Sequence, residues 1–122
     1  MARIRTENNH LIITMQGIRR FGALKKNLRI PLDDISGVFY DKAAWSALPN
    51  PLQKRAGANI YGLYFGGYFS VRGDKLFYDL KKKECAIVLE LKNHKLKRVI
   101  IGVDDPCTAV RVIETAMGKE AI

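Results

Sequence analysis

The sequence predicts a mainly β fold of the α+β class, with about seven short antiparallel strands followed by one C-terminal helix. Two observations carry this prediction. From residue 2 to residue 103, β-prone segments alternate with turn residues at close, regular spacing, which is typical of a sandwich or a barrel. After Asp104 the period changes, and apolar residues recur at helical spacing. Because the apolar stripe of such a helix must be buried, we expect it to cover the open end or groove of the sheet structure.

The expected strands are rich in β-branched and aromatic residues and are bounded by Gly, Pro, Asn and Asp. In chain order they are residues 2–6, 10–15, 28–32, 35–40, 60–71, 76–80, 85–91 and 97–103. Glu7, Asn8 and Asn9 suit a hairpin turn between the first two strands. Within residues 60–71 one parity of an extended chain holds Ile60, Gly62, Tyr64, Gly66 and Tyr68, and the other holds Tyr61, Leu63, Phe65, Gly67 and Phe69. This period of two favours strand over helix, and the glycines allow sharp bends. We expect a strongly bent strand pair there.

Three connections differ from short turns. Residues 16–27 contain glycine, four cations and no acid, and we expect a loop or an irregular edge strand. Residues 42–48 have the composition of one or two helical turns, which Pro49 would end. Residues 53–59 are expected to form a loop.

The C-terminal helix has clear signals at both ends. Asp105 is a good N-cap, Pro106 suits the first helical position, and Gly118 suits the C-terminal cap. The apolar residues at helical spacing are Ala109, Val110, Ile113, Ala116 and Met117. This segment is therefore predicted to be an amphipathic helix.

The length and composition point to a single domain spanning residues 1–122. Of the 122 residues, 48% are apolar, which is enough for one packed core. The longest stretch without a charge, residues 56–71, contains four glycines and is shorter than the roughly 20 apolar residues that a membrane-spanning helix needs. The first ten residues lack the apolar centre of a secretory signal. We expect no transmembrane segment and a cytoplasmic protein, free or bound at the inner face of the membrane.

The cysteines and histidines do not form a metal site at any recognised spacing. Cys85 and Cys107 are expected to be two buried thiols in a reducing compartment. His10 and His94 stand beside asparagines and are expected to be exposed turn residues. We therefore expect no cofactor and no metal.

The chain is strongly basic. Twenty-one Lys and Arg residues against twelve Asp and Glu residues give a net charge of +9, which favours nucleic acid, anionic lipid or an acidic protein as a partner. The charge does not choose among them. An enzyme is not expected, because the adjacent acids suit turns and helix caps and the main nucleophile, phosphate-loop and metalloprotease motifs are absent from the sequence.

Three motifs together with the closing helix resemble bacterial pleckstrin-homology-like (PH-like) domains. The motifs are IPLDDISGV from Ile30, GLYFGGYFSVRGDKLFYDL from Gly62, and RVIIGVDDP from Arg98. The resemblance spans about residues 11–117. It implies a bent antiparallel barrel of seven strands with a helix plugging one end, and a homo-oligomeric binding or assembly module instead of an enzyme.

Two groups of cations are candidate anion-binding residues. The resemblance implies a first cluster on residues 16–29, in the segment that binds phosphoinositides in eukaryotic relatives. Its members are Arg19, Arg20, Lys25, Lys26 and Arg29. The second cluster, which two hairpin turns are expected to bring to one end of the barrel, consists of Lys81, Lys82, Lys83, Lys95, Lys97 and Arg98. A solvated strand face or turn, or protection of a sheet edge, is the alternative for both clusters.

Tyrosines offer a second kind of surface. Tyr61, Tyr64, Tyr68 and Tyr78 could stack on bases if they were exposed beside cations, or could pack in the core or in a subunit interface. Given the resemblance, we take Tyr61, Tyr64 and Tyr68 as interface candidates.

The sequence thus predicts a non-enzymatic, self-associating PH-like module that presents a basic surface to lipid headgroups or an acidic protein. A nucleic-acid-binding module that uses the same basic turns is the alternative.

Overall fold

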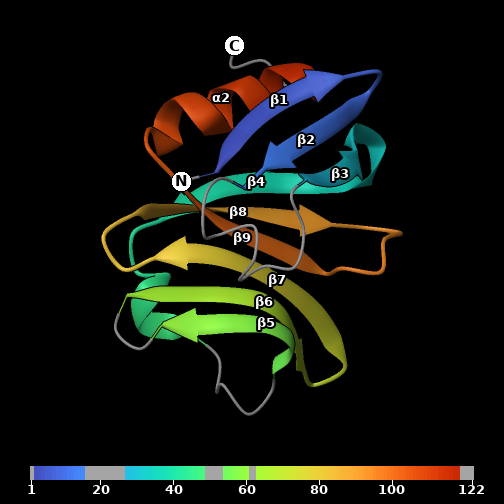
Figure 1. Ribbon diagram of the computed structural model, residues 1–122. Coiled ribbons are helices and arrows are strands. Elements are labelled where there is room, and N and C mark those ends of the chain that lie inside the picture. Colours follow the sequence, from blue (N-terminus) through green and yellow to red (C-terminus); the bar gives the residue numbers. More distant parts are fainter. Residues whose placement is uncertain (1, 16–26, 49–53, 61–62, 119–122) are drawn as a thin grey trace.

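The computed structural model describes residues 2–15, 27–48, 54–60 and 63–118, with residues 54–60 described in their backbone alone. Within these ranges the fold is mainly β and of the α+β class, with two sheets and one α-helix (Figure 1). The strands are β1 (Arg3–Glu7), β2 (His10–Thr14), β3 (Asn27–Pro31), β4 (Ile35–Asp41), β5 (Lys54–Ile60), β6 (Tyr64–Val71), β7 (Asp74–Lys81), β8 (Cys85–Leu91) and β9 (Arg98–Val103). The helices are α2 (Pro106–Ala116) and the short 3-10 turns η1 (Leu32–Asp34) and η2 (Trp45–Ala47).

The small sheet has the order β1-β2-β3 and is antiparallel throughout. The predicted hairpin turn is present and is one residue shorter than expected, since Asn8 and Asn9 adopt positive φ angles while Glu7 belongs to β1 and pairs with His10. Leu11, Ile13, Leu28 and Ile30 are buried on the inner face and join the main core, and Ile12 on the opposite face of β2 is buried as well. The opposite face carries exposed arginines from β1 and β3.

The large sheet has the order β4-β8-β9-β7-β6-β5. All its neighbouring strands are antiparallel except β7 and β9, which run parallel and pair from Leu76 with Arg98 to Asp79 with Ile101. Strand β9 therefore lies between β8 and β7 instead of continuing a simple meander. As a result, the turns that lead into β7 and into β9 lie at the same end of the sheet.

Successive side chains of a strand point to opposite faces of the sheet. The central strands of the large sheet are apolar at successive positions, so both faces of this sheet are apolar. One face packs against the small sheet and α2 and includes Phe77, Ile87, Leu89, Val99 and Ile101. The other face includes Phe65, Phe69, Tyr78, Val88 and Ile100, and residues of the β4–β5 connection pack on it. That connection contains η2, so the predicted helical turn is present.

Helix α2 begins where the sequence predicts and buries the predicted stripe. The Asp105 carboxylate accepts hydrogen bonds from the backbone N–H of Thr108 at 3.1 Å and from its hydroxyl at 2.7 Å. Ala109 and Ile113 are buried, and the helix packs mainly against β4 and β8. Figure 1 shows the helix beside the small sheet, next to the β4 edge of the large sheet. The prediction that this helix covers the sheet structure is confirmed.

The predicted barrel is wrong in three respects. The described residues form two open sheets rather than a closed barrel, nine strands rather than about seven, and one parallel pair among antiparallel ones. The physical reason is that β9 inserts between β8 and β7, which leaves β4 and β5 as separate edges of the large sheet. Local sequence patterns specify the strands but not this order.

Three local predictions are also wrong. Residues 54–60 form β5 instead of a loop, because pairing with β6 from Lys54 to Ile60 outweighs the weak strand propensity of a segment that contains alanine and glycine. Residues 64–71 form the single strand β6 instead of a bent pair within residues 60–71, and β6 pairs with β5 and β7. Cys107 is exposed and Cys85 is half-buried, so the two free cysteines are not both buried thiols.

Candidate functional site

An open groove at one end of the large sheet gathers four exposed lysines. We call it the basic groove and define it by Lys75, Lys92, Lys95 and Lys97. It has a volume of about 310 Å³ and is lined by residues of the turns that lead into β7 and β9. The parallel pairing of β7 with β9 brings these two turns together.

The β6–β7 turn supplies one wall of the groove. Arg72 and Gly73 have φ angles of 53° and 84°, and the flanking residues Val71 and Asp74 are paired across the hairpin. Two consecutive positive φ angles define a type I′ hairpin turn, which matches the twist of the strands on either side. The turn therefore holds Lys75, the second residue of β7, at the end of the sheet.

The β8–β9 connection supplies the other wall and is fixed at several points. The Lys97 backbone N–H donates to the carbonyl of Lys75 at 2.7 Å, and the Lys97 carbonyl accepts from Leu91 N–H at 3.0 Å. Leu96 is only 2% exposed and belongs to the main core. Its N–H donates to Nδ1 of His94 at 3.0 Å. The groove thus rests on an anchored turn.

The charges around the groove favour anions. The lining contains four lysines and one acidic residue, Asp74, and Asn93 and His94 add polar side chains. An ammonium group is a compact point charge that accepts many geometries of approach. The arrangement can therefore hold phosphate or carboxylate groups by charge.

The two turns of the predicted second cluster lie at opposite ends of the large sheet. Lys97 lies in the basic groove together with Lys95, but Lys81, Lys82 and Lys83 lie at the opposite end of the large sheet, because β8 runs antiparallel to β9. The Glu84 carboxylate accepts from Lys81 N–H at 2.9 Å at that end. The expectation that one end carries both groups is corrected by the strand order.

The remaining predicted cations are dispersed. Arg29 is exposed on β3, on the outer face of the small sheet. Arg98 is exposed on β9, and its Nη2 lies 3.7 Å from Oε2 of Glu90, a pair that contributes little because both side chains are largely solvated. Arg19, Arg20, Lys25 and Lys26 lie outside the described residues.

The tyrosines are turned largely inward. Tyr64 is only 5% exposed, Tyr68 is half-buried with its ring 5.0 Å from that of Phe77, and Tyr78 is buried against Phe65 and Phe69. Burial raises the pKa of the Tyr68 and Tyr78 hydroxyls. Tyr64 is therefore a core residue and not a residue of an exposed interface, and Tyr61 lies outside the described residues.

The sequence interpretation missed Lys75 and Lys92 as site residues. Both stand beside expected turns, so they were recognisable as exposed cations. Nothing in the local pattern shows that the turn before β7 lies beside the turn before β9, since this follows from the parallel pairing. The only related signal in the sequence is that β8 and β9 are both apolar and therefore belong inside a sheet. This signal does not say which strands lie beside them.

In the part of the chain that the structure describes, no three His, Cys, Asp or Glu side chains converge as metal ligands would. None of the described helices has the length and apolar character required to cross a bilayer.

Comparison with family models gives no match, and neither curated proteins nor solved structures give one.

Proposed function

We propose that this chain is a non-enzymatic binding module that docks on anionic lipid headgroups at the inner face of the membrane. The observation that carries the proposal is the convergence of Lys75, Lys92, Lys95 and Lys97 on one groove. We also propose membership of the PH-like domains, supported by the C-terminal helix that covers β-sheets. In this proposal the chain is a PH-like domain whose two sheets stay open and do not close into a barrel.

A lipid surface suits this groove better than nucleic acid does. Readers of single strands combine cations with exposed aromatic rings on which bases stack. The described lining of the groove contains no Phe, Tyr or Trp, and the tyrosines of β6 and β7 pack inward. The cations of the groove are lysines, which act as point charges, and not arginines, which bind a phosphate or carboxylate group through two hydrogen bonds. This composition favours a layer of many negative charges as the ligand over one specifically recognised group.

The membrane affinity expected of one basic groove is modest. Each Lys near an anionic leaflet contributes about 1 kcal/mol, so four contribute about 4 kcal/mol, which corresponds to a dissociation constant of the order of 1 mM. A self-associated pair of chains would present two grooves to one membrane and gain affinity through the raised effective concentration. Self-association is therefore part of the proposal.

The C-terminal half of β4, with two exposed aromatic rings, is the surface that we propose for a second copy of the chain. Strand β4 ends the large sheet, and Phe39 and Tyr40 on it are 42% and 45% exposed. Contact between two copies about a two-fold axis at these residues would cover the rings in both copies. This surface takes the place of the tyrosine strip that the sequence suggests.

The test is a competition at matched salt. The full chain is mixed with phosphatidylcholine vesicles, with or without phosphatidylserine, and then challenged with duplex DNA, single-stranded RNA or polyglutamate. We expect sedimentation with the anionic vesicles only, and weaker sedimentation as salt is raised. Retention by nucleic acid alone supports the nucleic-acid alternative, retention by polyglutamate alone supports an acidic protein partner, and binding to none of them refutes the proposal.

A further inference from the structure

A small pocket lies on the face of the large sheet on which the β4–β5 connection packs. It has a volume of about 150 Å³ and is lined by residues of β4, β7, β8 and β9 together with Ala44 and Ala47 of the connection. Its floor is a row of cross-strand neighbours, in which Val88 pairs with Ile100 and Ile100 pairs with Tyr78. All three are buried. A cavity of this volume accepts a molecule of about the size of benzene.

Two opposite charges flank this floor. Asp41 lies two residues after Phe39, which pairs with Val88. Arg98 lies two residues before Ile100, which also pairs with Val88. Strands β4 and β9 both run antiparallel to β8, so they run in the same direction, and Asp41 and Arg98 lie on opposite sides of the row. Both residues line the pocket. A carboxylate and a guanidinium group thus stand at the two ends of an apolar floor.

The polar groups of the pocket retain bonding capacity. Tyr78 is only 8% exposed, and within the described parts of the chain its hydroxyl makes no hydrogen bond, although a buried tyrosine hydroxyl usually has a partner. Burial raises the pKa of this hydroxyl, Arg98 lowers it and Asp41 raises it, so both charges act on one hydroxyl. The 3.7 Å ion pair of Arg98 with Glu90 is weak, because both side chains are largely solvated. One oxygen of Asp41 accepts from Ala43 N–H at 2.8 Å, which leaves the other for a ligand.

We propose that this pocket binds a small zwitterion that carries its two charges at opposite ends of an apolar segment, as ω-amino acids do. The carboxylate of the ligand meets Arg98 and the Tyr78 hydroxyl, and its ammonium group meets Asp41. Its methylene groups lie on Val88 and Ile100. A ligand with a single charge would be attracted by one end of the pocket and repelled by the other. The two ends together therefore select a zwitterion.

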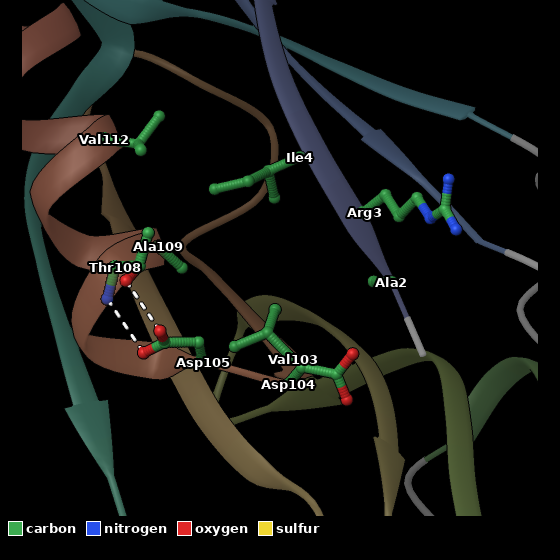
Figure 2. A pocket seen from close by; sticks show the side chains of 9 residues that line it. All are labelled: Ala2, Arg3, Ile4, Val103, Asp104, Asp105, Thr108, Ala109 and Val112. Carbon is green, nitrogen blue, oxygen red and sulfur yellow. Dashed lines mark hydrogen bonds between the residues drawn. The ribbon is translucent and has the colours of Figure 1, made fainter.

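The groove between β1 and α2 is larger, at about 280 Å³, but its polar groups are less available. Asp105 caps the helix through two hydrogen bonds with Thr108, which Figure 2 shows as dashed lines, and Arg3 extends away from the helix. The zwitterion site also goes beyond the proposed membrane function, because its lining includes none of the four lysines of the basic groove.

The test is a titration of the full chain with 6-aminohexanoate, hexanoate, hexylamine and glycine, followed by tryptophan fluorescence. Trp45 is the only tryptophan of the chain, begins η2 and packs on the same face of the sheet as the pocket. We expect 6-aminohexanoate to bind at least tenfold more tightly than hexanoate or hexylamine, because each of these lacks one charge. Glycine lacks the apolar segment and should cause no change.

Variants of the charged residues give a crossed pattern. Arg98→Gln should weaken binding of 6-aminohexanoate at least tenfold without weakening that of hexylamine, because it removes only the partner of the carboxylate. Asp41→Asn should weaken binding of 6-aminohexanoate and strengthen that of hexanoate, because it removes a repulsive charge and keeps an oxygen for Ala43 N–H. Tyr78→Phe keeps the ring and should weaken binding of both carboxylates. A purely structural role of these side chains would weaken all ligands alike.

Arg111→Gln is the matched control, because it removes one exposed arginine from α2, which packs on the opposite face of the large sheet. It should leave the binding of every ligand unchanged. Arg98 is exposed, so Arg98→Gln should fold. No binding of 6-aminohexanoate, equal binding of a singly charged analogue, or equal losses in Arg98→Gln and Arg111→Gln would each overturn the proposal.

Discussion

The Tyr64 hydroxyl donates a hydrogen bond of 2.6 Å to Oδ1 of Asp79, and Asp79 is fully buried. Gly66 is paired with Asp79 across β6 and β7, and a Cβ atom at this glycine would collide with the Tyr64 ring. The glycine thus makes room for the ring to lie along the strand and reach the carboxyl group. This contact places a polar pair inside a sheet that is otherwise apolar.

Tyr64→Phe should destabilise the protein by about 1.5–3 kcal/mol, since it removes a donor to a buried acceptor while keeping the ring. Urea unfolding gives the free energy. Tyr68→Phe is the control, because it removes a half-buried hydroxyl and keeps the ring packing on Phe77. A loss no larger for Tyr64→Phe than for Tyr68→Phe would show that the bond to Asp79 contributes little.

Ile113→Ala should lower the free energy of unfolding by about 2–5 kcal/mol, the range for a large-to-small change in a packed core. Ile113 is 0% exposed at the contact between the helix and the sheets. Val112→Ala, one residue away and 42% exposed, should change it far less. Equal effects of the two changes in thermal or urea unfolding would mean that the helix does not cover the sheets in solution.

Asp105→Ala should lower the melting temperature at neutral pH, because it removes the cap of α2. The hydrogen bonds from the Thr108 hydroxyl and N–H hold the pKa of the Asp105 carboxyl below its usual range. A lowered pKa in the folded state stabilises the protein above the ordinary Asp value, and this contribution is lost as the pH falls through the folded-state value. The difference between the variant and the original chain should therefore shrink below about pH 4.

Calorimetric scans over a pH series, with Asp105→Asn as the conservative variant, measure this effect. Asparagine caps helices nearly as well as aspartate, so Asp105→Asn should remain close to the original chain. A difference for Asp105→Ala that stays constant from neutral to acidic pH would argue against the ionised cap.

The elements of this fold are more predictable from sequence than their arrangement. Cys85–Leu91 is predicted with its observed bounds, because an apolar run from Cys85 to Leu89 with turns beyond both ends of the strand leaves few alternatives. Helix α2 is predicted because Asp105 and Pro106 mark its start. Strand β5 escapes prediction because its stability comes from pairing with β6 and not from its own residues.

The basic groove escapes prediction for a related reason. Lys97 is recognisable as a turn cation, but its neighbour Lys75 lies 22 positions earlier in the sequence. Only the parallel pairing of β7 with β9 makes them adjacent. The same strand order separates Lys81, Lys82 and Lys83 from Lys97, although all four belong to similar basic turns.

The most direct measurement compares vesicle binding by two charge-reversed variants of the full chain with that of the original chain. Lys92→Glu with Lys95→Glu changes the basic groove, and Lys82→Glu with Lys83→Glu changes the net charge equally at the opposite end of the sheet. Our account predicts that the groove variant binds phosphatidylserine vesicles at least about tenfold more weakly, at about 1 kcal/mol for each lysine, and that the other variant loses much less. Equal losses for the two variants, or no loss for the groove variant, would contradict it.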